Sequence, residues 1–199
     1  MCLVIERDQD QGTATTVVLN RPMAFKLTER LAQLVLNGAF GKTATATNKD
    51  VIKFMLAFSH ECAIYVGGPQ SQQEPAVMLH GISDLPGAIE VTNGIYRGGV
   101  PAAIQGVLAG KYMPLDFRFF IGRHSYTESM LDVQVLLGKY QPIACARSLA
   151  LKQCISLPKP LWHEGKRERD SCLHVLNSTS NRDTHSSSNH NYSSRTLWW

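Results

Sequence analysis

The sequence predicts a single domain of the α+β class, and three observations lead to this prediction. The chain has 199 residues, of which 44% are hydrophobic, and this is enough for one domain with a substantial core. Short apolar segments rich in β-branched residues end at turn-forming residues, as strands do. Between them lie segments of helical periodicity that begin at a capping residue or a proline.

The first predicted element is a β-hairpin made by residues 2–5 and 15–20, which the turn residues 8–12 connect. Pro22 has no backbone N–H, so the second strand is expected to end before it, with Asn20 and Arg21 at the strand end. A domain seldom opens in mid-strand. We therefore expect that one strand preceding residue 2 is missing from this chain.

Two helices are expected next. The first is predicted to begin after the capping residue Thr28 and to stop at Asn37-Gly38. The second is predicted to be capped by Asp50, although its apolar residues follow a helical period poorly.

The middle of the chain alternates between strands and a helix. Strands are predicted at residues 63–66 and 76–80, and a hairpin is predicted around the two-residue turn Asn93-Gly94. Pro101 suits the first turn of a helix that ends at Gly110.

The remaining elements of the domain follow from aromatic content and capping signals. Residues 115–122 predict a strand, and residues 143–146 predict a last strand followed by a short helix. Between them, Ser125 and Glu128 have the spacing of a capping box for a helix that ends at Gly138.

The chain is predicted to divide into a domain, residues 1–158, and a disordered tail, residues 159–199. Seven serines and four asparagines lie between residues 177 and 195, where almost nothing is apolar. Such a composition buries too little surface to offset the entropy lost on ordering.

Composition limits the function classes. Residues 1–164 carry 15 basic and 13 acidic side chains, so no strong nucleic-acid binding is expected. The five cysteines are odd in number and lack Cys-x-x-Cys spacing, which argues against a disulfide framework or a zinc site. No apolar run is long enough for a membrane span, and the N-terminus does not look like a signal peptide. These features predict a soluble intracellular protein of the cytoplasm or a plastid.

Five motifs in this order resemble the AlgH/YqgE family of bacteria and plastid-containing organisms. They are VLNRP at 18–22, VGGP at 66–69, LH at 79–80, GIY at 94–96 and RFFIG at 118–122. The resemblance covers roughly residues 2–155. Two departures occur: the expected first strand is lacking, and a Gly-Trp and Gln-Leu signature is replaced around Tyr126 and Met130-Leu131.

The resemblance implies a strongly bent mixed β-sheet, a pseudo-barrel, that is flanked by helices. No enzymatic activity is established for the family as a whole. One branch is named a transcriptional regulator, although the fold resembles no standard DNA-binding module.

The sequence also predicts one candidate ligand site, at the strand ends. An arginine fork, a histidine and a glycine turn with bare N–H groups suit a small anion. The structural alternative is that Asn20 closes a turn, Arg21 pairs with a buried carboxylate such as Asp116, and His80 is a satisfied interior histidine. The candidate residues are Asn20, Arg21, Gly67, Gly68, His80 and Arg118.

Three function hypotheses follow. The first is an uncharacterised AlgH/YqgE-like protein with a non-catalytic binding or regulatory role, linked to transcription in one version. The second is an enzyme or small-anion-binding protein that uses Asn20, Arg21, His80 and Arg118. The third is a truncated, non-functional product. The first is preferred, with no catalytic residues, no cofactor, no metal and no membrane partner, and with a small anion or a protein as the partner.

Overall fold

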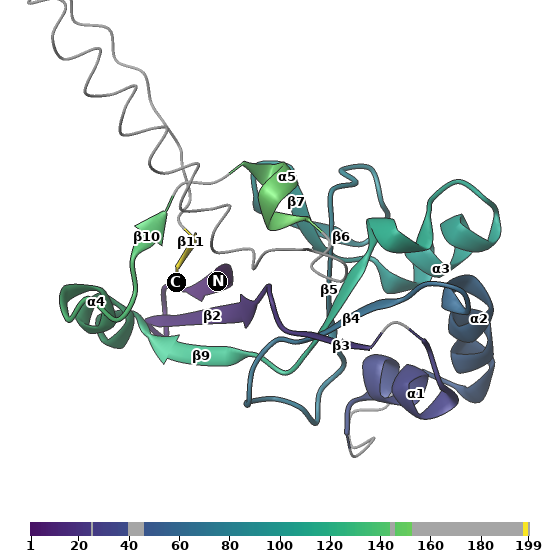
Figure 1. Ribbon diagram of the computed structural model, residues 1–199, viewed down its shortest axis with the longest axis horizontal. Helices are drawn as coiled ribbons and strands as arrows, with labels where there is room; N and C mark the ends of the chain where they lie inside the picture. Colours follow the sequence, from purple (N-terminus) through teal and green to yellow (C-terminus); the bar gives the residue numbers. More distant parts are fainter. Residues whose placement is uncertain (25, 40–45, 144–145, 153–196, 199) are drawn as a thin grey trace, which may run out of the picture.

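The computed structural model describes residues 1–24, 26–39, 46–143, 146–152 and 197–198 (Figure 1). These residues form two β-sheets and several helices, which confirms the predicted α+β class. Neither sheet closes on itself in the described part of the chain, so the pseudo-barrel is not confirmed. Two hydrogen-bonded sheets take the place of the single bent sheet that was expected.

One sheet, which we call the terminal sheet, contains both ends of the described chain. Its order is β10-β11-β1-β2-β9, and its strand pairs are antiparallel. Its strands are β1 (Cys2–Asp8), β2 (Thr13–Val18), β9 (His124–Thr127), β10 (Pro142–Ile143) and β11 (Leu197–Trp198).

The other sheet, the central sheet, is mixed. Its order is β3-β4-β8-β5-β7-β6, and β4 and β8 run parallel while the other pairs are antiparallel. Its strands are β3 (Pro22–Ala24), β4 (Ala63–Val66), β5 (Val77–His80), β6 (Ala88–Thr92), β7 (Ile95–Gly98) and β8 (Arg118–Ile121).

Helices α1 (Glu29–Asn37), α2 (Asn48–Phe58) and α3 (Val100–Leu108) cover one face of the central sheet. They pack around Phe119 and Ile64. The opposite face of the central sheet packs against the terminal sheet in a second core, which contains Tyr65 and Phe120. A further helix, α4, lies beside the terminal sheet on the other side of the molecule (Figure 1). The helices are α1 (Glu29–Asn37), α2 (Asn48–Phe58), α3 (Val100–Leu108), α4 (Glu128–Leu136) and α5 (Arg147–Ala150), with a 3-10 turn η1 (Pro114–Asp116).

The segment 19–21 carries the chain from one sheet to the other. β2 ends at Val18, before Pro22 as predicted, but Pro22 itself opens β3 and faces Tyr65 in the central sheet. Two backbone bonds hold this crossing: Val18 N–H donates to the Gly67 carbonyl at 2.9 Å, and Leu19 N–H donates to the Met1 carbonyl at 2.9 Å.

Most local signals are confirmed, and three are corrected. Thr28 caps α1 and Gly38 ends it, as predicted. The N-cap of α2 is Thr47 rather than Asp50, which instead occupies the third helical position and bonds back to Thr47.

The other two corrections lie around β8. The strand predicted for 115–122 starts only at Arg118, because residues 114–116 form η1. The cap of α4 is Thr127 rather than Ser125, since Ser125 belongs to β9, which pairs with β2.

The predicted tail, residues 159–199, lies outside the described residues except for Leu197–Trp198. These two residues form β11, which pairs with β1 on one side and β10 on the other. Among the helices of the described ranges, none combines the length and apolarity needed to cross a membrane.

Candidate functional site

His80 is a fully buried residue of β5 whose two ring nitrogens are both hydrogen-bonded. The Ile82 N–H donates to Nδ1 at 3.2 Å, so the proton is on Nε2, which donates to the Gly98 carbonyl at 3.2 Å. Its ring stacks on Tyr96 at 6.0 Å. Burial lowers the pKa of His80, so the ring is neutral at pH 7. His80 is therefore the satisfied interior histidine of the structural alternative.

Arg118 and His80 lie on opposite faces of the central sheet. Arg118 is opposite Leu79, and paired residues share a face, so Arg118 points with Leu79 and Phe120 toward the terminal sheet. His80 follows Leu79 directly and points the other way, toward Phe117 on the helix-covered side. One ligand cannot contact both side chains through the sheet, so the predicted cluster is separated.

Asn20 and Arg21 lie together at the crossing between the sheets. Asn20 Oδ1 accepts a hydrogen bond from the Met1 amino group at 2.8 Å. The Arg21 side chain is exposed rather than buried. Asp116 is not its partner, because Asp116 lies in η1 and its Oδ2 accepts from the Met113 N–H at 2.8 Å. Among the described residues, Arg21 therefore does not form the predicted ion pair with a buried carboxylate.

Gly67 and Gly68 mark a close approach of two backbones rather than an open anion nest. The Gly67 N–H already donates to the Ile121 carbonyl at 2.8 Å. A Cβ on Gly67 would overlap the carbonyl oxygen of Gly122, and one on Gly68 would overlap the backbone of Arg123. The glycines are needed for packing where β4 and β8 end.

A pH prediction follows from the buried histidine. The folded-state pKa of His80 is below its ordinary value of 6.5, so as the pH falls the unfolded chain binds a proton at this histidine before the folded chain does. The free energy of unfolding should fall as the pH drops from about 6.5 toward the lowered pKa. Urea denaturation across this range should show a smaller fall for His80→Gln than for the parent. Equal slopes for the two proteins would contradict the prediction.

The unfolding free energy of His80→Gln should still fall somewhat as the pH drops, because a second histidine also titrates differently in the folded chain. The pKa of His124 is also lowered, by burial and by the charge of Arg21, so this histidine contributes in the same direction.

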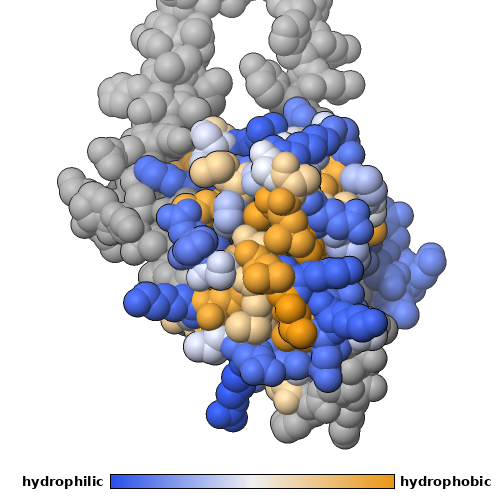
Figure 2. All heavy atoms as spheres, turned by 90° about the vertical axis from the view of Figure 1, so that its right-hand side faces the viewer, coloured by the Kyte–Doolittle hydropathy of each residue, from blue (hydrophilic) through white to orange (hydrophobic). Residues whose placement is uncertain are grey.

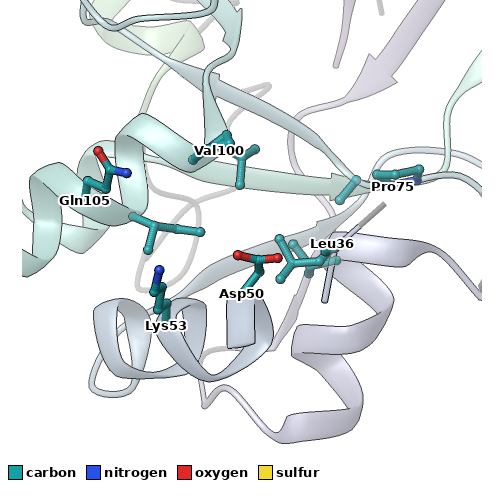
Figure 3. A pocket seen from close by; sticks show the side chains of 11 residues that line it. Leu36, Asp50, Lys53, Pro75, Val100 and Gln105 are labelled. Atoms are coloured by element: carbon teal, nitrogen blue, oxygen red, sulfur yellow. The ribbon is translucent and has the colours of Figure 1, made fainter. Parts of the chain in front are cut away.

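A cavity of about 350 Å³ opens between α1, α2 and α3, and the sequence did not indicate it (Figure 3). Its apolar wall includes Val35, Leu36, Val100 and Ile104. A cavity of this size and lining is typical of a binding site for an apolar group. Two neighbouring helices, α1 and α2, form it together with the distant helix α3, so no single sequence motif predicts it.

Two charged residues of α2, Asp50 and Lys53, lie at this cavity and rise from α2 toward α3 (Figure 3). Asp50 is committed to the helix cap, because its Oδ2 accepts from the Thr47 N–H at 2.8 Å and from the Thr47 hydroxyl at 2.7 Å. These bonds lower the pKa of Asp50. Lys53 has no carboxylate within ion-pair distance in the part of the chain that the structure describes. The positive charge of Lys53 nevertheless acts on the Asp50 carboxylate and adds to the lowering of its pKa, so the cavity carries one positive and one negative charge.

The outer face of α2, which we define as Lys49, Ile52, Lys53 and Leu56, is exposed beside this cavity. Ile52 is 58% exposed and Leu56 is 65% exposed, although most of the large apolar side chains are buried. Figure 2 shows that apolar side chains gather in a strip on this side of the molecule, with hydrophilic side chains on both sides of it. The helix thus buries one apolar face in the core and exposes a second apolar stripe, Ile52 and Leu56, to solvent.

The fold and its surfaces define a two-sheet α+β domain with a helix-lined cavity. The described residues contain no cluster of three or more potential metal ligands. Residues 1–170 match the AlgH-like family (DUF179), and the chain belongs to this family. This confirms the resemblance seen in the sequence motifs.

Several solved structures are similar to this chain, among them the following two. The AlgH protein of Pseudomonas aeruginosa is 16% identical over 93% of each chain, with a TM-score of 0.48. A Corynebacterium diphtheriae protein is 16% identical over 69% of this chain, with a TM-score of 0.44, and this chain spans 61% of its length. No curated protein matches the chain.

Proposed function

We propose that this protein is a non-catalytic binding protein that docks an acidic amphipathic helix of a partner protein on the outer face of α2. The observation that carries the proposal is the exposure of Ile52 and Leu56 between Lys49 and Lys53. Residues four apart lie one above the other on a helix, so the face presents an apolar pair and a basic pair side by side.

Burial of the apolar pair supplies the binding energy. Covering a fully exposed leucine or isoleucine contributes about 1.5–3 kcal/mol, and these two side chains still have more than half of their surface to lose. The adjacent cavity gives a partner side chain a place to insert, as anchor residues do at protein interfaces. A flat lipid surface has no such side chain, so the cavity favours a protein partner.

Charge selects the kind of helix. Lys49 and Lys53 make no ion pair within 4.0 Å among the described residues, although the charge of Lys53 acts on the Asp50 carboxylate. Two lysines and one aspartate leave this side of α2 with one excess positive charge. A partner helix with Glu or Asp beside its apolar positions would complement this face, and a basic helix would be repelled.

The thiol of buried Cys62, with its pKa raised to about 12 by desolvation, offers no competing chemistry. The transcription-linked version of a regulatory role has no feature of the described residues in its favour.

The test uses a labelled synthetic helix with leucines at helical spacing flanked by glutamates, and a twin with lysines in place of the glutamates. Fluorescence anisotropy should show binding of the acidic peptide and much weaker binding of its basic twin. Leu56→Asp should lower the affinity for the acidic peptide about tenfold or more, because the change removes an apolar anchor residue and adds charge repulsion. Leu136→Asp is the matched control, since Leu136 is 85% exposed on α4, and it should bind like the parent.

Three results would contradict the proposal. They are equal affinity for the two peptides, unchanged binding by Leu56→Asp, and binding to anionic lipid vesicles without binding to the acidic peptide. The last result would assign the face to a membrane surface instead.

A further inference from the structure

A polar cluster lies on the outer face of the terminal sheet, away from α2. Strand register places it there: Thr16 is opposite His124, and Cys2 is opposite Val18, so these side chains share one face. The alternate residues Leu3 and Val17 point into the core between the sheets. The cluster thus combines a thiol, a hydroxyl and an imidazole that come from three strands.

Arg21 supplies a positive charge whose field reaches this face. Burial raises the pKa of Cys2, and the N-terminal amino group and then Arg21 oppose that rise; burial and then Arg21 lower the pKa of His124. Arg21 is exposed, and the described residues supply no carboxylate within ion-pair distance of it. By contrast, three other arginines each hold a glutamate: Arg7, Arg97 and Arg123.

Thr16 gives an independent sign of a ligand. Its Oγ1 is buried, and no hydrogen-bond partner for it occurs among the residues that the structure describes. Buried hydroxyls without a hydrogen-bond partner are rare, so a bound ligand is a reasonable partner for this one.

His124 is held in place beside Thr16. Its ring stacks on Tyr126 at 5.8 Å with an interplanar angle of 13°, and the Tyr126 hydroxyl bonds to that of Tyr140 at 2.9 Å. Burial and the charge of Arg21 keep the imidazole neutral, so one ring nitrogen can donate a hydrogen bond.

We propose that Arg21, together with Thr16 and His124, forms a binding site for a phosphate monoester. The planar fork of Arg21 matches two phosphate oxygens at once, and the hydroxyl and imidazole are neutral donors beside it. The uncompensated cation gains more from a phosphate dianion than from a carboxylate. Asn20, next in the chain, has an amide nitrogen left as a further donor, since its Oδ1 is used by Met1.

The first measurement is the NMR titration of the His124 ring in the full chain, with inorganic phosphate as the probe. In the parent, millimolar phosphate should shift the ring resonances saturably and raise the pKa of His124, because a bound anion favours imidazolium. Arg21→Ala should raise the pKa of His124 without phosphate and should bind phosphate about tenfold more weakly. Arg30→Ala, at another exposed arginine, should respond like the parent.

The second measurement is the rate of alkylation at Cys2, resolved by mass spectrometry. Phosphate should slow this rate in the parent, because an anion near the thiol raises its pKa and covers it. Arg21→Ala should react more slowly than the parent without phosphate and should show little further effect of phosphate. Buried Cys62 is the internal reference and should not respond. The proposal is overturned if phosphate affects neither His124 nor Cys2, or if Arg21→Ala and Arg30→Ala respond to it equally.

Discussion

Gly122→Ala should remove a large part of the stability of this domain. Gly122 has φ +70°, and a Cβ there would overlap the carbonyl oxygen of Gly68. Relief of this overlap requires the ends of β4 and β8 to separate. The alanine would also be held in a left-handed conformation that side chains seldom adopt.

The magnitude follows from what the separation breaks. Gly67 N–H donates to the Ile121 carbonyl at 2.8 Å, and Gln70 and Arg123 exchange two backbone bonds of 3.0 and 2.9 Å. At about 1 kcal/mol for each lost bond, and about 1–3 kcal/mol for the strained backbone, the loss is about 4–6 kcal/mol. This is a large fraction of a typical unfolding free energy of about 5–15 kcal/mol.

The matched control is Gly110→Ala, and urea denaturation is the measurement. Gly110 has φ +72°, close to that of Gly122, but a Cβ there meets no atom within 4 Å. Its loss should be limited to the backbone cost of about 1–3 kcal/mol, at the low end on an exposed loop. If the two variants were destabilised equally, the close contact between the two glycine turns would not be what holds this junction together.

Phe119→Ala should be similarly damaging, for a different reason. Phe119 is fully buried in β8, and its ring packs edge-on against Phe54 and Phe58, each at a centroid distance of 5.2 Å. Truncation leaves a cavity between the central sheet and α2 and removes both aromatic contacts. The expected loss in unfolding free energy is about 3–5 kcal/mol.

Leu136→Ala is the control for this second variant. Leu136 is a large apolar residue too, but it is 85% exposed, so its truncation should change stability by no more than about 0.5 kcal/mol. Thermal and urea unfolding should rank the proteins in this order: parent and Leu136→Ala together, Phe119→Ala well below. A Phe119→Ala protein that unfolds with the parent would mean that α2 does not depend on this ring.

The signals that sequence reasoning located correctly are those that act within a few residues. Thr28 caps α1 because its hydroxyl reaches the Leu31 N–H three residues on, at 3.3 Å. Gly38 ends that helix because it can adopt a positive φ. The Asn93-Gly94 turn joins β6 and β7 for the same kind of local reason.

The capping errors show where local rules compete. Thr47 and Asp50 both suit an N-cap, and the pair forms one capping box in which Thr47 takes the cap position. Ser125 has the capping-box spacing before α4, but it belongs to β9 because it pairs with Thr15 of β2. That pairing joins residues more than a hundred positions apart, so a short window of sequence cannot reveal it.

The sequence by itself determined the α+β class, the family motifs, most element positions and the end of β2 before Pro22. Capping, turn geometry and proline sterics are properties of neighbouring residues. Only the tertiary structure decided which side chains meet. Alternation within a strand is local, but the register of Leu79 with Arg118 is not, and it places Arg118 and His80 on opposite faces. The same long-range pairing brings His124 to Thr16, on a face that Arg21 influences, because the pairing of distant strands depends on the burial of the whole core.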